Sequence, residues 1–405
     1  MNAPLSAPLF AAVEMAPRDP ILGVTEAFNA DPNPNKVNLG VGVYYDESGK
    51  VPLLECVRRA EQVIAGKSAP HAYLPIDGMA AYDRAVQRLL FGADSDILTS
   101  GRAATVQALG GTGALKVAAD FLRRFAPGAQ VWISDPSWEN HRALFEGAGF
   151  VVNTYPYYDP STHGLDFERM IDALGRIPAG AIVVLHACCH NPTGVDPSAE
   201  QWTKILERVR AGGHIPLLDL AYQGFGDGID ADGAIARRLA DTPAPLFVAS
   251  SFSKSFSLYG ERVGALSIVA ADRDEAARAL SQVKRVIRSN YSSPPGFGSL
   301  AVQTVLDSVE LRALWENELA AMRERIRAIR RALVERLKVH APRANFDFVP
   351  QQRGMFSYSG LTREQVARLR SEFSIYAIDS GRICVAALNQ RNLDYVAGAI
   401  GAVIA

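Results

Sequence analysis

The chain has 405 residues, of which 48% are hydrophobic and 21% are charged, and its 42 lysines and arginines almost balance its 43 aspartates and glutamates. This composition excludes a disordered chain, and the formal charge of -1 argues against nucleic acid or an acidic membrane surface as a main partner. The length allows two or three domains, each large enough to bury a core without disulfides or metals.

The first 16 residues are rich in proline and alanine and predict an N-terminal arm rather than a core element. No basic residue precedes Arg18, so the start lacks the positive segment of a secretory signal. The longest strongly apolar run with strand character, 181–189, is too short to cross a bilayer. We therefore expect a cytoplasmic protein that binds neither membrane nor nucleic acid.

The four cysteines show no CxxC spacing, which argues against a disulfide framework or a metal site. Cys188 and Cys189 are adjacent, and on a strand their side chains would point to opposite faces. A reducing compartment is the better expectation for such a chain.

The middle of the chain alternates short apolar runs with amphipathic stretches. The apolar runs lie at 130–135, 181–189, 215–222, 246–251 and 263–270. The stretches between them have helical spacing, as in 198–213. This alternation predicts an α/β fold in which helices cover both faces of a mostly parallel sheet.

A second regime begins near Leu311, where apolar residues recur at steps of three and four as far as Leu337. No glycine or proline lies between Gln303 and His340, so we expect one long amphipathic helix that bridges two domains. Glutamates are interleaved with its arginines, which are therefore expected to face solvent. These arginines are Arg323, Arg325, Arg327, Arg330 and Arg331.

Beyond this helix, Thr362 and Gln365 have the spacing of a capping box, and the remaining residues favour a smaller α+β domain. The predicted division is an arm at 1–16, a small domain formed by 17–49 and 322–405, and a large domain at 50–321.

Side chains that can bind a ligand or take part in catalysis follow the predicted strands at their carboxyl ends, where ligands bind in such sheets. They are Trp138, Asn191, Asp219, Tyr222, Ser251, Ser253 and Lys254. An aromatic plate, an amide, a carboxylate, a phenol and a lysine at one edge suit a flat cationic ring that carries a phenolate oxygen and an aldehyde.

Two segments could hold a phosphate. Arg262 offers a bidentate fork, to which Ser251 and Ser253 add neutral donors. The glycine-rich turn 110–113 precedes a helical stretch, whose free N–H groups favour an anion. The turn could equally be a plain helix entry, and we expect neither a dinucleotide fingerprint nor a strand directly before it.

Six segments together resemble the fold-type-I, pyridoxal-phosphate-dependent aspartate and aromatic aminotransferases. They read YLPIDG, SDPSWENH, CCHNPTG, DLAYQGF, SFSKSFSLYGERVG and SGRICVAAL. The likeness runs in order, with matching spacing, from Asp19 to the C-terminus.

The resemblance implies that Lys254 links covalently to pyridoxal 5'-phosphate and moves the substrate proton, and that Asp219 pairs with the ring nitrogen. Tyr222 and Asn191 would bind the phenolate oxygen, and Trp138 would stack on the ring and border the substrate. His141 would support Asp219 from behind. Taken alone, the tryptophan and the histidine would be ordinary core residues.

The resemblance also implies a phosphate site and a substrate site. Gly111, Thr112, Ser251, Ser253 and Arg262 would hold the phosphate, with Tyr73 contributed by a neighbouring subunit. Arg382 would bind the substrate α-carboxylate, assisted by Gly42 and Asn191. Arg288 of the neighbour would bind a distal carboxylate, although it could also be one more basic residue on a helix. The enzyme would then be a homodimer with shared active sites.

Three departures from the aspartate branch of the family favour the aromatic branch. They are Ser293 in YSSPP, Phe297 in PPGFG, and Ser257 with Gly260 in FSLYGERVG. The loop QRGMFSYSG is similar to that of aromatic aminotransferases. We predict transfer of the amino group of tyrosine, phenylalanine and aspartate to 2-oxoglutarate by a ping-pong mechanism, with a strict aspartate aminotransferase as the alternative.

Three other classes compete with this interpretation. A pyridoxal-phosphate lyase or decarboxylase would share Lys254, Asp219 and Arg262 but would have less use for both Arg288 and Arg382. A binding module such as the sensor half of a transcription regulator would need a DNA-binding domain ahead of Asp19. A nicotinamide oxidoreductase would need a strand-coupled GxGxxG motif, which is not apparent.

Overall fold

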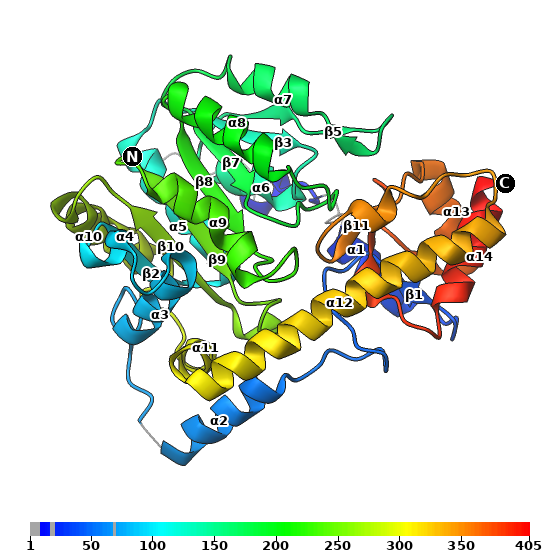
Figure 1. Cartoon of the computed structure of the whole chain (residues 1–405), viewed down its shortest axis with the longest axis horizontal. Coiled ribbons are helices and arrows are strands. Elements are labelled where there is room, and N and C mark those ends of the chain that lie inside the picture. The colour runs from blue at the N-terminus through cyan, green and yellow to red at the C-terminus, as the bar shows by residue number, and fades with distance from the viewer. Residues whose placement is uncertain (1–8, 17–20, 68–69) are drawn as a thin grey trace.

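A seven-stranded sheet forms the centre of the larger of two lobes in the computed structural model, which describes residues 9–16, 21–67 and 70–405 (Figure 1). The strand order is β2-β10-β9-β8-β7-β3-β4. Strand β10 runs antiparallel to both of its neighbours, and every other pair is parallel, so the predicted mostly parallel sheet is confirmed. The strands are β2 (Ala103–Leu109), β3 (Val131–Asp135), β4 (Val152–Pro156), β7 (Ile182–His186), β8 (Ile215–Leu220), β9 (Leu246–Ser251) and β10 (Val263–Val269).

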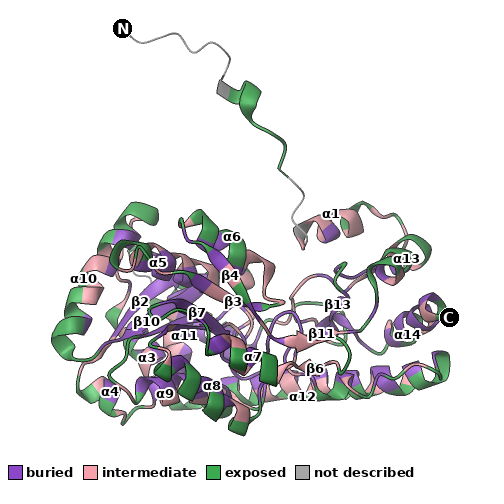
Figure 2. Cartoon of the chain, turned by 90° about the horizontal axis from the view of Figure 1, so that it is seen from above, coloured by how far each residue is buried: buried purple, intermediate pink, exposed green. Residues whose placement is uncertain are grey.

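Helices cover both faces of this sheet, as its two-sided apolar strands require. One face packs against α5 (Gly110–Phe125), α6 (Glu139–Gly147) and α10 (Arg273–Asn290). The other face carries α3 (Ala80–Phe91), α7 (Phe167–Leu174), α8 (Ala199–Ala211), α9 (Ile229–Ala240) and α11 (Phe297–Asp307). The strands between these layers are buried (Figure 2).

Strand β2 corrects one expectation, because it leads directly into the glycine-rich turn. Its polar residues conceal its strand character in the sequence. Thr105 and Gln107 are buried, and each forms a hydrogen bond with a distant segment. Thr105 Oγ1 lies 2.8 Å from Ser267 Oγ, and Gln107 Nε2 donates to the carbonyl of Pro295. Tertiary partners therefore make a strand from a run that is not apolar throughout.

In its described residues, the smaller lobe contains two short ladders and three helices of its own. Strands β1 (Val37–Asn38) and β12 (Ile375–Tyr376) pair in parallel, and β11 (Phe356–Tyr358) pairs antiparallel with β13 (Arg382–Cys384). The helices are α1 (Leu22–Ala30), α13 (Arg363–Phe373) and α14 (Leu393–Ile404). The capping box of Thr362 and Gln365 is present at the start of α13.

The long helix is α12 (Val309–His340), which runs from the larger lobe into the smaller one (Figure 1). Helix α12 begins two residues before the predicted start. Ser308 caps it by accepting a hydrogen bond from Leu311 N, and this residue separates α12 from α11. The domain boundaries stay a prediction.

The remaining elements are α2 (Glu55–Lys67), α4 (Asp96–Thr99), a hairpin of β5 (Tyr158–Asp159) with β6 (Gly164–Leu165), and 3-10 turns at Leu9–Ala12, Tyr259–Glu261, Val349–Gln351 and Val385–Ala387.

The expectation that all five arginines of α12 face solvent is wrong for Arg330, and it holds only in part for Arg323 and Arg325, whose side chains are 17% and 15% exposed. The Arg330 side chain is only 2% exposed and donates to the carbonyls of Gly354 and Phe356 at 2.6 Å and to Ser357 Oγ at 3.1 Å. A charged group can be buried in this way because its donors are paired.

The cysteine pair also differs from expectation. Cys189 lies beyond the end of β7 and has a left-handed backbone (φ 52°), so its side chain does not alternate with that of Cys188. The two sulfur atoms and the carboxylate of Asp232 lie within 4.8 Å of one another. Asp232 accepts hydrogen bonds from three backbone N–H groups of the loop after β8, at 2.7–2.9 Å, and thus holds that loop. All four cysteines, each of which the structure describes, are buried free thiols.

Residues 10–16 of the N-terminal arm are exposed, while 1–8 and 17–20 lie outside the described residues. Among the helices in the described ranges, none has the length and apolar character needed to cross a membrane.

Candidate active site

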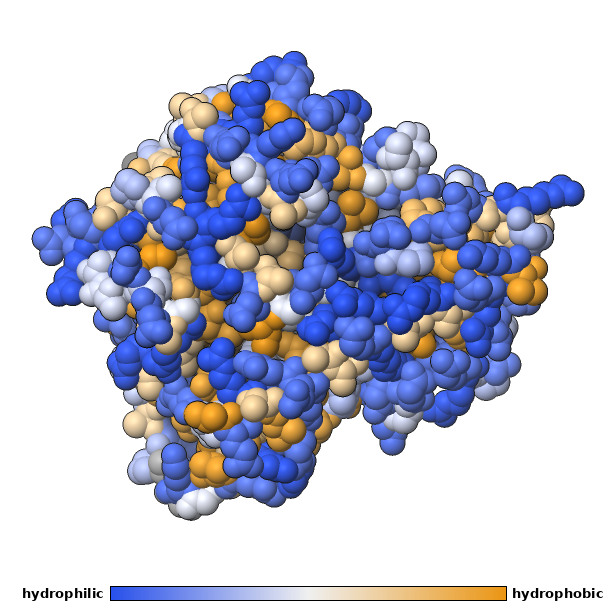
Figure 3. Space-filling model, in the orientation of Figure 1, coloured by the Kyte–Doolittle hydropathy of each residue, from blue (hydrophilic) through white to orange (hydrophobic). Residues whose placement is uncertain are grey.

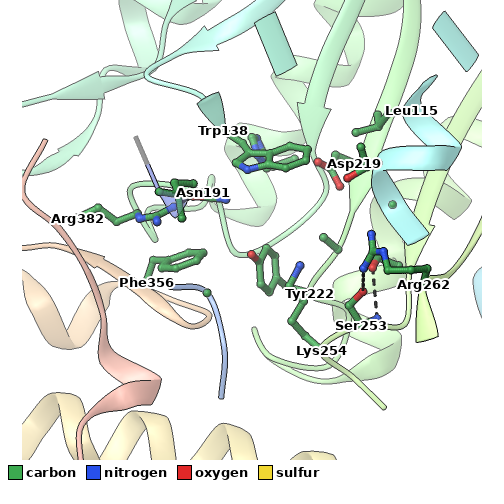
Figure 4. Close-up of a pocket in the computed structure, with 17 residues that line it drawn as sticks. Leu115, Trp138, Asn191, Asp219, Tyr222, Ser253, Lys254, Arg262, Phe356 and Arg382 are labelled. Atoms are coloured by element: carbon green, nitrogen blue, oxygen red, sulfur yellow. Dashed lines mark hydrogen bonds between the residues drawn. The ribbon is translucent and has the colours of Figure 1, made fainter. Parts of the chain in front are cut away.

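One cavity lies at the carboxyl ends of the parallel strands, between the two lobes (Figure 4). It collects twelve of the fourteen residues that the sequence singled out for binding or catalysis: Gly42, Gly111, Thr112, Trp138, Asn191, Asp219, Tyr222, Ser251, Ser253, Lys254, Arg262 and Arg382. The topology explains this convergence. Strands β2, β9, β8, β7 and β3 all end at the same edge, because β10 reverses the direction twice.

Lys254 follows β9 and reaches into the middle of the cavity, where its Nζ lies 4.9 Å from the centre of the Tyr222 ring (Figure 4). Burial lowers the pKa of the lysine to about 8, the Asp219 carboxylate opposes this shift, and the Arg262 guanidinium adds to it. A substantial fraction of the amine is therefore neutral near pH 8, as a nucleophile or a proton acceptor requires.

Asp219 lies within β8 and is supported by a short relay of hydrogen bonds. His141 Nε2 lies 2.9 Å from Asp219 Oδ2, and Ser137 Oγ lies 2.9 Å from His141 Nδ1. Because a carboxylate only accepts, we assign the hydrogen to Nε2 of the histidine. Burial would raise the pKa of Asp219, but the hydrogen bond from His141 and nearby positive charge outweigh it, and the pKa lies below its ordinary value. The carboxyl group therefore stays ionised in an apolar setting.

An anion-binding corner forms where the glycine-rich turn approaches Arg262. The guanidinium donates to Ser253 Oγ at 3.3 Å and to the carbonyl of Tyr259 at 3.0 Å. Gly110 has φ 68°, and a Cβ at this position would lie 2.5 Å from Arg262 Nη2. Glycine is thus required here by both the backbone and the arginine. The N-terminus of α5 adds unpaired N–H groups to the corner.

Arg382 lies at the other end of the cavity, on β13 of the smaller lobe (Figure 4). Its Nη1 donates to Asn191 Oδ1 at 3.0 Å and its Nη2 to the carbonyl of Gly40 at 2.7 Å. The guanidinium carbon lies 4.3 Å from the centre of the Phe356 ring. Nε is buried, and none of the described residues accepts a hydrogen bond from it. This orphaned donor points to an acceptor that the protein alone does not supply.

Five further residues border the cavity that sequence reasoning did not assign: Ile21, Leu115, His186, Ala221 and Phe356. Phe356 closes the wall beside Gly42, where a Cβ would lie 2.7 Å from its ring. His186 ends β7, and burial lowers its pKa to about 3, so it is neutral. The sequence could have indicated His186 as a site residue, because it stands at the carboxyl end of a predicted strand. Phe356 stands in the segment QRGMFSYSG, but nothing in that segment marks its contact with Arg382.

Two predicted site residues do not reach this cavity within one chain. Tyr73 is 97% exposed. Arg288 is also exposed, and its guanidinium donates to Ser292 Oγ within its own segment. Both had been assigned to the site of a neighbouring subunit, and that assignment stays a prediction.

Comparisons with known proteins agree with this arrangement. Residues 34–400 match the family model "Aminotransferase class I and II". An aspartate aminotransferase of Pseudomonas aeruginosa is 61% identical over 97% of this chain and 98% of its own length. An aromatic-amino-acid aminotransferase of Escherichia coli is 50% identical over 98% of this chain and its own full length.

A solved structure of an aromatic-amino-acid aminotransferase from Burkholderia pseudomallei, covalently bound to pyridoxal phosphate, superimposes with a TM-score of 0.96. It is 62% identical and covers 98% of this chain and 100% of that one. The match to the family model and these identities over nearly the whole length leave no room for a regulator or a nicotinamide oxidoreductase. The chain belongs to the class I and II aminotransferases and is an enzyme of that family.

Proposed function

We propose that this enzyme is a pyridoxal-phosphate-dependent aminotransferase that moves the amino group of aromatic amino acids, and also of aspartate, to 2-oxoglutarate. One observation carries the proposal: a lysine of lowered pKa stands beside a buried carboxylate, with an arginine at each end of the same cavity. The two arginines suit two different anions, a phosphate at Arg262 and a substrate carboxylate at Arg382.

The residues present fit pyridoxal phosphate by the chemistry of their donors. Arg262, Ser251, Ser253 and the start of α5 offer donors to a phosphate, and Gly110 and Gly111 leave room for close approach. At the position of Gly111, a Cβ would lie 3.1 Å from Ser251 Cβ. Asp219, with a lowered pKa, is suited to hold a protonated ring nitrogen.

When bound, the cofactor supplies an aldehyde that combines with amines and a protonated ring that withdraws electrons. The protein supplies the rest. Asn191 and Tyr222 border the cavity and would donate to a phenolate oxygen, and burial raises the pKa of Tyr222, so it remains a donor. Trp138 provides an aromatic face. Lys254 Nζ would accept the proton from the substrate Cα and return it to the bound cofactor.

Arg382 would bind the α-carboxylate of the substrate through its unpaired Nε, with Asn191 and Gly42 beside it. Because the two half-reactions use the same site in turn, we expect ping-pong kinetics. A lyase or decarboxylase, the remaining competitor within this cofactor class, would work on a single substrate.

We also propose a homodimer with shared active sites, in which Tyr73 reaches the phosphate and Arg288 the distal carboxylate of the partner's substrate. The exposure of both residues supports this. Apolar side chains are exposed on α2, on α11 and at the start of α12, namely Val63, Phe297 and Val309. Figure 3 shows hydrophobic residues over α2 and α11, as a surface covered by a second copy would have. Four free buried thiols support a cytoplasmic location.

Two substrate preferences are considered, one for aromatic amino acids and one for aspartate. The aromatic preference is supported by Ser293, Phe297 and Ser257 in the sequence, and by likeness to a structure named as an aromatic-amino-acid aminotransferase. A strict aspartate aminotransferase is the second candidate, because the relative from Pseudomonas aeruginosa carries that name at 61% identity.

The test is a panel of kcat/KM values for tyrosine, phenylalanine, aspartate and leucine, each with 2-oxoglutarate. We expect the aromatic substrates to equal or exceed aspartate, leucine to be poor, and double-reciprocal lines to be parallel. Aspartate at least about 100-fold above both aromatic substrates would favour the second candidate, a difference of about 2.7 kcal/mol in transition-state binding. Turnover of one amino acid without an oxo acid would contradict transamination.

A further inference from the structure

The hairpin of β5 and β6 projects from the larger lobe toward the smaller one (Figure 1). The Asp159 carboxylate organises its tip, accepting hydrogen bonds from Ser161 N at 2.9 Å, Ser161 Oγ at 2.7 Å and Thr162 Oγ1 at 2.9 Å. His163 follows with φ 55°, a left-handed backbone conformation. Hydrogen bonds to one carboxylate thus fix the turn that carries this histidine.

The ring of His163 stacks on Phe348 of the smaller lobe, with centroids 3.9 Å apart and planes 14° from parallel. The imidazole also lies against Gly360, where a Cβ would be 3.1 Å from His163 Cε1. A second contact stands beside the first: Tyr158 meets Tyr358 edge to face at 5.1 Å, and Tyr158 Oη lies 3.2 Å from His163 Nδ1. Four rings from two lobes thus form one aromatic clasp: Tyr158, His163, Phe348 and Tyr358.

In the smaller lobe, Tyr358 of the clasp and Arg382 lie on the two paired strands β11 and β13, which together are called the ribbon. Tyr358 on β11 is the cross-strand partner of Arg382 on β13. One residue further along, Ser359 Oγ donates to the carbonyl of Gly381 at 2.7 Å, which fastens the end of the ribbon next to Arg382. Displacement of Tyr358 would therefore move Arg382 with it.

We propose that the clasp is a positioning device, in which His163 holds the smaller lobe docked so that Arg382 stays over the cavity. This inference rests on the proposed function, because it assumes that Arg382 binds the substrate carboxylate. His163 does not border the cavity, so it acts through the contacts of the clasp and the paired strands β11 and β13. The clasp favours the docked arrangement in which substrate binds and leaves the proton transfer at Lys254 unchanged.

The test variant is His163→Asn, because asparagine tolerates the left-handed backbone but has no ring to stack. We expect KM for the amino acid, and the dissociation constant of an unreactive dicarboxylate such as succinate, to rise about three- to tenfold, which is typical of a lost aromatic pair. The value of kcat should change less than twofold. Without any ligand, amide hydrogen exchange in β11 should become faster.

Two further variants make the result specific. Phe348→Leu should produce the same rise in KM, and adding it to His163→Asn should produce little more, because both remove one contact. Phe348→Tyr keeps the stack and should behave like the wild type. Pro160→Ala changes an exposed residue of the same hairpin and serves as the matched control.

An unchanged KM and unchanged exchange in β11 for His163→Asn would overturn the clasp while leaving the aminotransferase proposal intact. A fall in kcat at constant KM would also overturn it, since that would place His163 in the chemistry. If instead the wild-type enzyme transaminates nothing, the proposed function fails, and hydrogen exchange alone would still report whether His163 docks the lobe.

Discussion

At the scale of single residues, Lys254 is controlled by opposing influences. Burial lowers its pKa to about 8, whereas the neighbouring carboxylate of Asp219 raises it. Only the neutral amine attacks an aldehyde, and its fraction grows as pH rises through the pKa. At about pH 8, half of the Lys254 side chains therefore carry no charge.

This adjustment predicts how the enzyme reloads after its cofactor is removed. The rate at which the stripped protein recovers its absorbance with added pyridoxal phosphate should rise with pH and level off above about 8. In Asp219→Asn the opposing charge is absent, so the lysine pKa falls and the midpoint moves to lower pH. Stopped-flow absorbance measures both profiles. A midpoint that stays put, or moves to higher pH, would contradict the assigned balance.

Sequence reasoning identified Lys254, Asp219 and Arg382 because each stands in a segment whose spacing is distinctive. It could not identify Phe356 or His186, whose importance comes from what lies opposite them. Phe356 matters because Arg382 packs on its ring, and His186 because β7 ends beside Asp219. Contacts between segments far apart in the chain leave no local trace.

At the scale of elements, Arg330 illustrates the same limit. The helical spacing of α12 was apparent, and interleaved charges suggested a solvated face. The burial of this arginine depends on the carbonyls of the segment 354–356, which turn toward it. Periodicity predicts a helix, but a buried charge is decided by the partners that meet it.

Arg330 therefore predicts a large effect on stability. In Arg330→Met two buried carbonyls and Ser357 Oγ lose their donors, and we expect the free energy of unfolding to fall by about 3 kcal/mol. The adjacent, exposed Arg331→Met is the matched control, with an expected change below about 0.5 kcal/mol. Urea titration followed by circular dichroism gives both values. Equal, small changes would show that the buried arginine contributes nothing to stability.

At the scale of the whole molecule, the sequence predicted the sheet and its covering helices because the strands are apolar on both faces. It missed β2, whose Gln107 and Thr105 find partners only after folding, and it missed the edge strand β4, which is only partly buried and has the polar residues Asn153 and Thr154 at its centre. The proposed homodimer lies further still from any local pattern, and the exposure of Tyr73 and Arg288 opens it directly to experiment.

Combining one inactive and one weakened subunit in the same dimer tests whether the active sites are shared. Lys254→Ala should have almost no activity, and Arg288→Ala should lose about ten- to hundredfold in kcat/KM for aspartate, the worth of a charge-assisted hydrogen bond. In a hybrid dimer, one site combines an intact Lys254 with the partner's intact Arg288. We expect the purified hybrid to recover the wild-type KM for aspartate and about half of its kcat per dimer. A hybrid with only the activity of its Arg288→Ala subunit would place both residues in the same chain's site.

Helix α12 has 32 residues, which at about 1.5 Å per residue makes a beam roughly 48 Å long. It is anchored in one lobe and carries the other at its far end. A tilt of about 5° at the anchored end would sweep the tip through about 4 Å, more than the width of a water molecule. A very slight adjustment in the packing of α12 would therefore shift the smaller lobe, and Arg382 with it, relative to the rest of the cavity, without local unfolding.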